Sequence, residues 1–99
     1  MSTDTITRIK PQTDLATPGM FKVIYKNDNQ TTVDFVVDSC VEYFNYTVEE
    51  GINIANKVHE IGSAVVAVLP HELAEQKGAE VTQAARGKGF PLVVQVKKD

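Results

Sequence analysis

From residue 20 onwards, the pattern of apolar and polar residues predicts strands alternating with helices. Residues 21–26 combine aromatic and β-branched side chains, which favours a strand, and residues 27–30 form a turn cluster rich in Asn and Asp. Residues 63–69 are almost entirely apolar, which predicts a buried central strand. Residues 91–96 predict a last strand, because proline is tolerated at the first residue of a strand.

The segment that follows the turn cluster predicts a helix with one buried face. Thr31 and Asp34 resemble a capping box at its start, with Asp in place of the usual Glu or Gln. Apolar residues then recur three and four positions apart, as they do along one side of a helix; they are Val33, Val36, Val37, Cys40, Val41 and Phe44. We expect Cys40 to fill space in the core.

Two more helices are predicted before the last strand. Thr47 and Glu50 form a second capping box, and Gly62 stands where a left-handed C-terminal cap is expected. The apolar stripe of this helix is Val48, Ile52, Ala55 and Val58. Pro70 suits the first turn of the third helix, which ends near residues 87–89 and carries Leu73, Ala74, Val81, Ala84 and Ala85.

These elements predict an α+β fold. Their order is that of an open β-α-α-β-α-β sandwich, with three helices packed on a three-stranded antiparallel sheet. Residues 1–19 contain five Thr, two Pro and no aromatic residue, so we expect a flexible N-terminal extension there. Residues 20–99 are expected to form a single domain.

Composition excludes several classes of function. The 99 residues carry a net charge of −3 and no long run of Lys or Arg, which argues against nucleic-acid binding. No apolar run approaches the roughly 20 residues that span a bilayer, and residues 1–19 do not resemble a signal peptide. One Cys and two His are a poor start for a metal site. We therefore expect a cytoplasmic protein without metal or cofactor.

Three polar side chains are candidates for binding a cation. Asn27, Asp28 and a neutral His59 can each accept hydrogen bonds, and an α-amino group is a cation with three donors. A ligand with an ammonium head and an apolar tail fits such a site if it lies beside the first helix's apolar face. This requires the turn cluster and the end of the second helix to be neighbours, which residue spacing alone does not establish.

The chain resembles the ClpS family, the adaptors that bind N-degron substrates of the Clp protease. The resemblance extends from Met20 to about Val96 and rests most specifically on Asn27-Asp28, Val58-His59 and Pro91-Leu92. Matching positions between and around these pairs are residues 21–24, Thr31, residues 35–36, Tyr46, residues 48–49, Gly62, Ala64, Glu72, residues 74–75 and Lys77.

The resemblance implies a function and a set of site residues. Members bind a substrate by its free α-amino group and bulky hydrophobic first residue, then deliver it to a ClpA- or ClpC-type AAA+ unfoldase. By position, Asn27, Asp28, Thr31 and His59 bind the α-amine and the start of the peptide. The hydrophobic pocket is Val33, Val36, Val37, Ala55, Val58 and Leu92. Glu72 and Lys77 match the surface that contacts the N-domain of the unfoldase.

Four positions depart from the family pattern. Asn29 replaces an acidic residue at the rim of the site, and Thr32 replaces a usual Pro. Val33 and Ala55 stand where Met is common, so the pocket is expected to be roomier at Ala55 and stiffer at Val33. These changes predict a relaxed preference for the first residue, including tolerance of β-branched side chains.

Two other classes of function stay open at this point. The C-terminal domain of ribosomal protein L7/L12 resembles the predicted architecture and recruits partners through a helical face, so a non-degradative interaction module is one alternative. In that case Glu72 and Lys77 matter, whereas Asn27 and His59 do not. An enzyme using Asp28 and His59 as an acid–base pair is the other, although no nucleophile, metal cluster or cofactor loop accompanies them.

Overall fold

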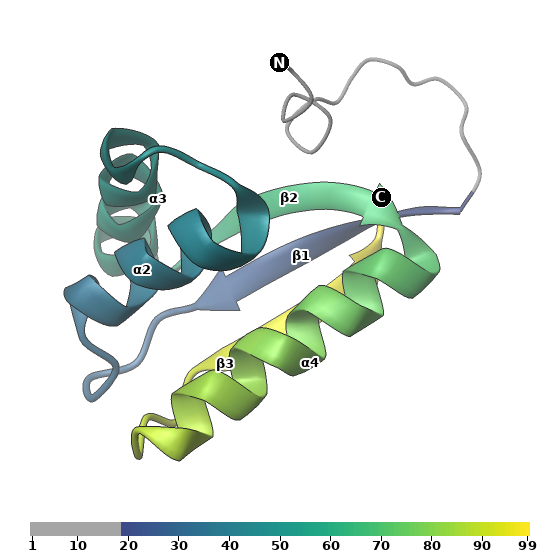
Figure 1. The fold of residues 1–99 in the computed structure, drawn as a ribbon. Helices are drawn as coiled ribbons and strands as arrows, with labels where there is room; N and C mark the ends of the chain where they lie inside the picture. Colours follow the sequence, from purple (N-terminus) through teal and green to yellow (C-terminus); the bar gives the residue numbers. More distant parts are fainter. Residues whose placement is uncertain (1–18) are drawn as a thin grey trace.

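A computed structural model of the chain describes residues 19–99. The predicted N-terminal extension, residues 1–19, lies outside the described residues except for Gly19. The elements follow the predicted order and are labelled in Figure 1: β1 (Met20–Lys26), α2 (Val33–Phe44), α3 (Val48–Ile61), β2 (Ser63–Pro70), α4 (His71–Gly87) and β3 (Val93–Lys98). The predicted α+β class, with three helices packed on a three-stranded antiparallel sheet, is confirmed.

The first strand lies at the centre of the sheet. The strand order is β2-β1-β3, and β1 is antiparallel to both neighbours. The prediction of a central strand at residues 63–69 is therefore wrong, since β2 is an edge strand. Its register skips Val66, and this bulge leaves Val66 and Ala67 both buried. The apolar run thus reflects the bulge, not burial on both faces, and Val65 on the same strand is 47% exposed.

A buried hydrogen-bond chain joins the central strand to α2. The Ser39 hydroxyl donates to the Val36 carbonyl at 2.8 Å, so the Tyr25 hydroxyl donates to Ser39 Oγ at 2.7 Å. Burial is the main cause that raises the pKa of Tyr25, which keeps the phenol neutral. Burial also raises the pKa of the Cys40 thiol to about 12, and Cys40 lies in the core as expected.

Helix α2 begins one residue later than the capping box predicted. Thr32 has extended backbone angles, and its hydroxyl accepts from the Phe35 N–H at 3.1 Å, so Thr32 is the N-cap instead of Thr31. The buried face is also rotated from the prediction. Val33 and Val41 are exposed, and the buried residues are Phe35, Val36, Val37, Ser39, Cys40 and Phe44.

Helix α3 has both predicted caps. The Thr47–Glu50 capping box is present, and Gly62 has a φ of 107° as the left-handed C-terminal cap. Val48 and Ile52 were expected in the apolar stripe, but they are 59% and 43% exposed. Gly51 is buried instead, because α3 approaches α2 so closely there that a Cβ on Gly51 would lie 3.2 Å from the Val37 carbonyl oxygen.

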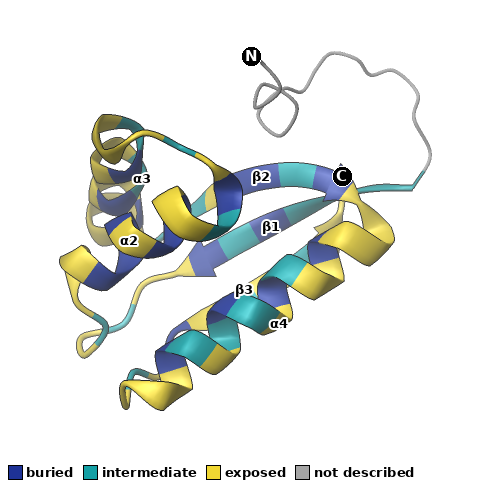
Figure 2. Cartoon of the chain, viewed as in Figure 1, coloured by how far each residue is buried: buried dark blue, intermediate teal, exposed yellow. Residues whose placement is uncertain are grey.

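Helix α4 and the last strand differ from the prediction at their ends. Pro70 is the N-cap of α4, and Leu73 is 37% exposed, although it was expected in the apolar stripe. Strand β3 begins at Val93 and not at Pro91, because its pairing with β1 ends at Lys26 and Val93. Figure 2 shows the remaining pattern, with buried positions of the helices directed inwards and exposed positions outwards.

The close approach of α2 and α3 leads to a stability prediction. Gly51→Ala is expected to lower the free energy of unfolding by about 1–2 kcal/mol, since the added Cβ meets backbone atoms of Val37 that cannot rotate away. Urea unfolding measures this. Gly87→Ala is the control, because no atom lies within 4 Å of its added Cβ and Ala favours the helix. A Gly51→Ala protein as stable as the Gly87→Ala protein contradicts the close approach.

Candidate functional site

The loop after β1 lies against the end of α3. The Asn27 N–H donates to the Gly62 carbonyl at 2.9 Å, and the Gly62 N–H donates to the Val58 carbonyl at 3.0 Å. Since His59 follows Val58, these two bonds place the turn cluster beside the last turn of α3. The juxtaposition that the amine-binding hypothesis requires is therefore present in the fold.

Asp28 organises this loop. Its Oδ1 accepts from the backbone N–H groups of Gln30 and Thr31, and its Oδ2 accepts from the Thr31 hydroxyl, each at 2.7 Å. Partial burial raises the pKa of Asp28, but the bonds from Thr31 and Gln30 and the charge of Arg86 outweigh it and hold the pKa below its usual value. Asp28 is therefore a stable carboxylate that fixes the loop and supplies a negative charge.

Asn27 and His59 have free hydrogen-bonding capacity. Both residues are exposed, and within residues 19–99 neither side chain makes a hydrogen bond or an ion pair. The Asn27 side-chain oxygen and one ring nitrogen of a neutral His59 are both acceptors. The geometry thus separates the roles of the three polar residues: Asp28 builds the loop, whereas Asn27 and His59 remain available to a ligand.

The apolar side chains predicted to line a pocket come from α2, α3 and the segment before β3. Five of the six are buried to 9% exposure or less, namely Val36, Val37, Ala55, Val58 and Leu92. Val33 is the exception at 49%. The five buried residues belong to the hydrophobic core, whereas Val33 lies on the surface.

Comparison with known proteins assigns the chain to a family. The model of the ATP-dependent Clp protease adaptor protein ClpS matches residues 16–95. The chain belongs to the ClpS family. The ClpS adapter of Wolinella succinogenes is 40% identical over 86 residues, covering 87% of this chain and 84% of that protein. The ClpS adapter of Nautilia profundicola is 39% identical over 88 residues, covering 89% and 91%.

A solved ClpS structure has the same fold. Agrobacterium tumefaciens ClpS2, bound to L-phenylalaninamide, superposes with a TM-score of 0.81 at 31% sequence identity. The match covers 84% of this chain and all of that chain. The family model places this chain among the adaptors of the Clp protease, which are not themselves proteases.

The two residues expected to contact an unfoldase lie far from the loop of Asn27 and Asp28. Glu72 is exposed in the first turn of α4, while Lys77 is half-buried with its Nζ 3.9 Å from Glu80. The N–H of His71 donates to the Gly19 carbonyl at 3.0 Å, which fixes this end of α4 at the start of β1. Asn27 follows the last residue of β1, so the two predicted surfaces lie at opposite ends of the central strand.

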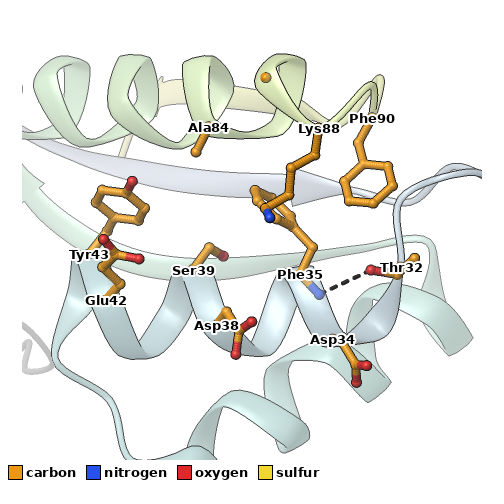
Figure 3. A pocket seen from close by; sticks show the side chains of 11 residues that line it. Thr32, Asp34, Phe35, Asp38, Ser39, Glu42, Tyr43, Ala84, Lys88 and Phe90 are labelled. Atoms are coloured by element: carbon orange, nitrogen blue, oxygen red, sulfur yellow. Dashed lines mark hydrogen bonds between the residues drawn. The ribbon is translucent and has the colours of Figure 1, made fainter.

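A separate groove of about 630 Å³ lies between α2 and α4 (Figure 3). It is lined by Thr32, Asp34, Phe35, Asp38, Ser39, Glu42, Tyr43, Ala84, Gly87, Lys88 and Phe90, none of which belongs to the site predicted from the ClpS resemblance. The sequence did not indicate the groove, because its two sides are about 50 positions apart in the chain. The groove combines the apolar side chains of Phe35, Tyr43 and Phe90 with the carboxylates of Asp34, Asp38 and Glu42. The residues around Asn27 and His59 stay the candidate ClpS site, because the ClpS resemblance predicts them.

Within residues 19–99, no group of three or more His, Cys, Asp and Glu side chains is arranged to hold a metal ion. No helix in the same range is long and apolar enough to cross a membrane.

The bonds around Asp28 lead to a titration prediction. Thr31→Val removes the hydroxyl that donates to Oδ2, so the pKa of Asp28 should rise towards its ordinary value, as measured by carboxyl ¹³C NMR. Because the pKa of Asp28 is lower in the folded protein, its carboxylate stabilises the fold at pH values above its ordinary pKa. This stabilisation is lost as the pH falls through the folded-state pKa. Thr31→Val should therefore destabilise the protein at neutral pH, with a smaller difference in acid.

Thr32→Val is the matched control for this titration. It removes the N-cap hydroxyl of α2 and should lower stability by about 1 kcal/mol, while the Asp28 pKa stays unchanged. An Asp28 pKa that is the same in Thr31→Val as in the unmodified protein contradicts the role assigned to Thr31.

Proposed function

We propose that this protein is an N-degron adaptor. It binds the free α-amino group and bulky hydrophobic first residue of a substrate and delivers the substrate to a ClpA- or ClpC-type AAA+ unfoldase in the cytoplasm. The observation that carries the proposal is the bond from the Asn27 N–H to the Gly62 carbonyl, because it joins the Asn27 loop to the last turn of α3, where Val58 is buried and His59 is exposed.

The polar residues suit a protonated α-amine. The ammonium has three N–H donors, and the Asn27 oxygen and a neutral His59 nitrogen provide two acceptors. The charge of Asp28 favours the cation, although both of its oxygens already accept bonds from the loop. L-phenylalaninamide, the compound bound to the Agrobacterium relative, has a free α-amine and a benzyl side chain, which agrees with this chemistry.

The apolar wall sets the expected preference for the first residue. Val33 is exposed at its edge, and Ala55 is the smallest of the six side chains proposed to line the pocket. A pocket with Ala at this position has room for a side chain that is bulky close to its Cα, so we include Ile and Val among the accepted first residues beside Phe and Leu.

A peptide array that varies only the first residue measures this preference for the first residue. Binding of peptides that begin with Phe and Leu, without binding of those that begin with Ile or Val, contradicts it.

In this proposal, the surface that contacts the unfoldase lies at the end of the central strand opposite to the loop of Asn27 and Asp28. The exposed Glu72 and the half-buried Lys77 lie on α4 away from the amine-binding loop, so a bound substrate leaves this surface accessible to the unfoldase N-domain. The non-degradative interaction module on the fold of the ribosomal L7/L12 C-terminal domain would use the same surface. It makes no use of Asn27 or His59, and the next experiment separates the two.

The amine-binding role predicts a specific loss of affinity. A peptide that begins with free Phe should bind, and its N-acetylated form should bind at least about 100-fold more weakly, because acetylation removes the positive charge and two donors. Asn27→Ala and His59→Ala should each weaken binding of the free peptide by about tenfold, which corresponds to roughly 1.4 kcal/mol. Fluorescence anisotropy with a labelled peptide measures these affinities.

Glu72→Ala and Lys77→Ala are the matched controls, because both residues lie far from the loop and should leave peptide affinity unchanged. Equal binding of the free and acetylated peptides contradicts the proposed function. Loss of partner binding in the controls alone, with no effect of Asn27→Ala or His59→Ala on any binding, supports the interaction module instead.

A further inference from the structure

The guanidinium group of Arg86 holds the segment that follows α4. Its Nη1 donates to the carbonyl oxygens of Phe90 and Leu92, each at 2.9 Å. The backbone reverses direction just before this segment, where Gly89 has a φ of 81° and the Phe90 N–H donates to the Ala85 carbonyl at 2.9 Å. Since the two carbonyls accepting from Arg86 flank Pro91, one side chain fixes both ends of residues 90–92.

This segment carries one wall of the proposed pocket. Leu92 is 1% exposed, and the Phe90 ring packs edge-on against Phe35 with centroids 5.5 Å apart. The ladder between β1 and β3 extends only to Val93, so the sheet pairing stops short of Leu92. The next residue, Leu92, is held instead by the hydrogen bond from Arg86 to its carbonyl oxygen. Arg86 is therefore bonded to the backbone of Leu92 at the position where the strand pairing no longer holds it.

The charge of Arg86 also affects Asp28, in the loop of the proposed site. Partial burial raises the pKa of Asp28, whereas hydrogen bonds from Thr31 and Gln30 and the positive charge of Arg86 lower it. Arg86 thus favours the carboxylate form of the residue that organises the amine-binding loop. The same side chain connects α4 to the apolar wall by hydrogen bonds and to the polar loop by its charge.

We infer that Arg86 is a positioning residue of the substrate site, holding Leu92 in the pocket wall without touching the substrate. This inference rests on the proposed function. Arginine suits the role because its guanidinium group is always charged and carries several N–H donors in one plane. Glutamine is uncharged and too short to reach both carbonyls, while lysine keeps the charge but has a different donor geometry.

The experiment compares three variants in binding to a peptide that begins with free Phe. Arg86→Gln should weaken binding by threefold or more, and Arg86→Lys should recover part of that loss. Lys88→Gln is the matched control, because it removes another exposed cation at the same end of α4, one that donates no hydrogen bond to residues 90–92. Thermal unfolding establishes that each variant is folded at the temperature of the binding measurement.

The possible results separate this inference from the proposed function. If the unmodified protein does not bind the peptide, the proposed function fails and the role of Arg86 fails with it. If the unmodified protein binds and Arg86→Gln changes its affinity less than threefold, only the role of Arg86 is overturned. An equal loss in Arg86→Gln and Lys88→Gln, or no recovery in Arg86→Lys, also overturns it, because a positioning role requires that particular side chain.

Discussion

The antiparallel pairing of β1 with β2 continues one residue beyond the strand itself. Lys26 pairs with Ser63, and the next backbone N–H, that of Asn27, donates to the carbonyl of Gly62. Gly62 is in turn the left-handed cap of α3, so this bond fixes the turn cluster to the last turn of that helix. The approach of the Asn27 loop to the His59 turn depends on it, since Asn27 and His59 come from parts of the chain about 30 positions apart.

Different interactions hold the three parts of the proposed site, which are the apolar pocket residues, the loop of Asn27 and Asp28, and helix α4. Five of the six predicted pocket residues belong to the hydrophobic core, and Val33 alone is exposed. The loop has no such packing and is shaped by the three hydrogen bonds that Asp28 accepts. Helix α4 is hydrogen-bonded through Arg86 to the segment that carries Leu92, and it also carries Glu72 and Lys77, so one helix extends from the proposed unfoldase surface to the proposed substrate pocket.

The sequence predicted the order of the elements and the fold class, because helical periodicity and caps are local signals. Thr47, Glu50 and Gly62 act at the ends of α3 as expected. Predictions that depend on tertiary contacts were less accurate. The apolar run at residues 63–69 did not reveal an edge strand with a bulge, because two consecutive buried side chains look the same in a sequence as burial on both faces.

The site was predictable only in part, for the same reason. The side chains of Asn27, Asp28 and His59 indicate hydrogen-bond acceptors, but their proximity depends on a non-local backbone bond that spacing does not encode. Their assigned roles, and those of the pocket residues, came from resemblance to ClpS proteins. The functions of Thr31 as a donor to Asp28 and of Arg86 as a donor to Leu92 gave no sequence signal, since each depends on a particular rotamer in the folded chain.

The central claim is that a free α-amine binds between the Asn27 loop and the end of α3. Titrating the ¹⁵N-labelled protein with L-phenylalaninamide and recording amide chemical shifts tests it most directly. The account predicts that the shift changes concentrate in residues 27–31 and 58–62 and around Leu92, and that N-acetyl-L-phenylalaninamide produces none of them. Changes centred on the groove between α2 and α4, or the same changes with the acetylated compound, would contradict it.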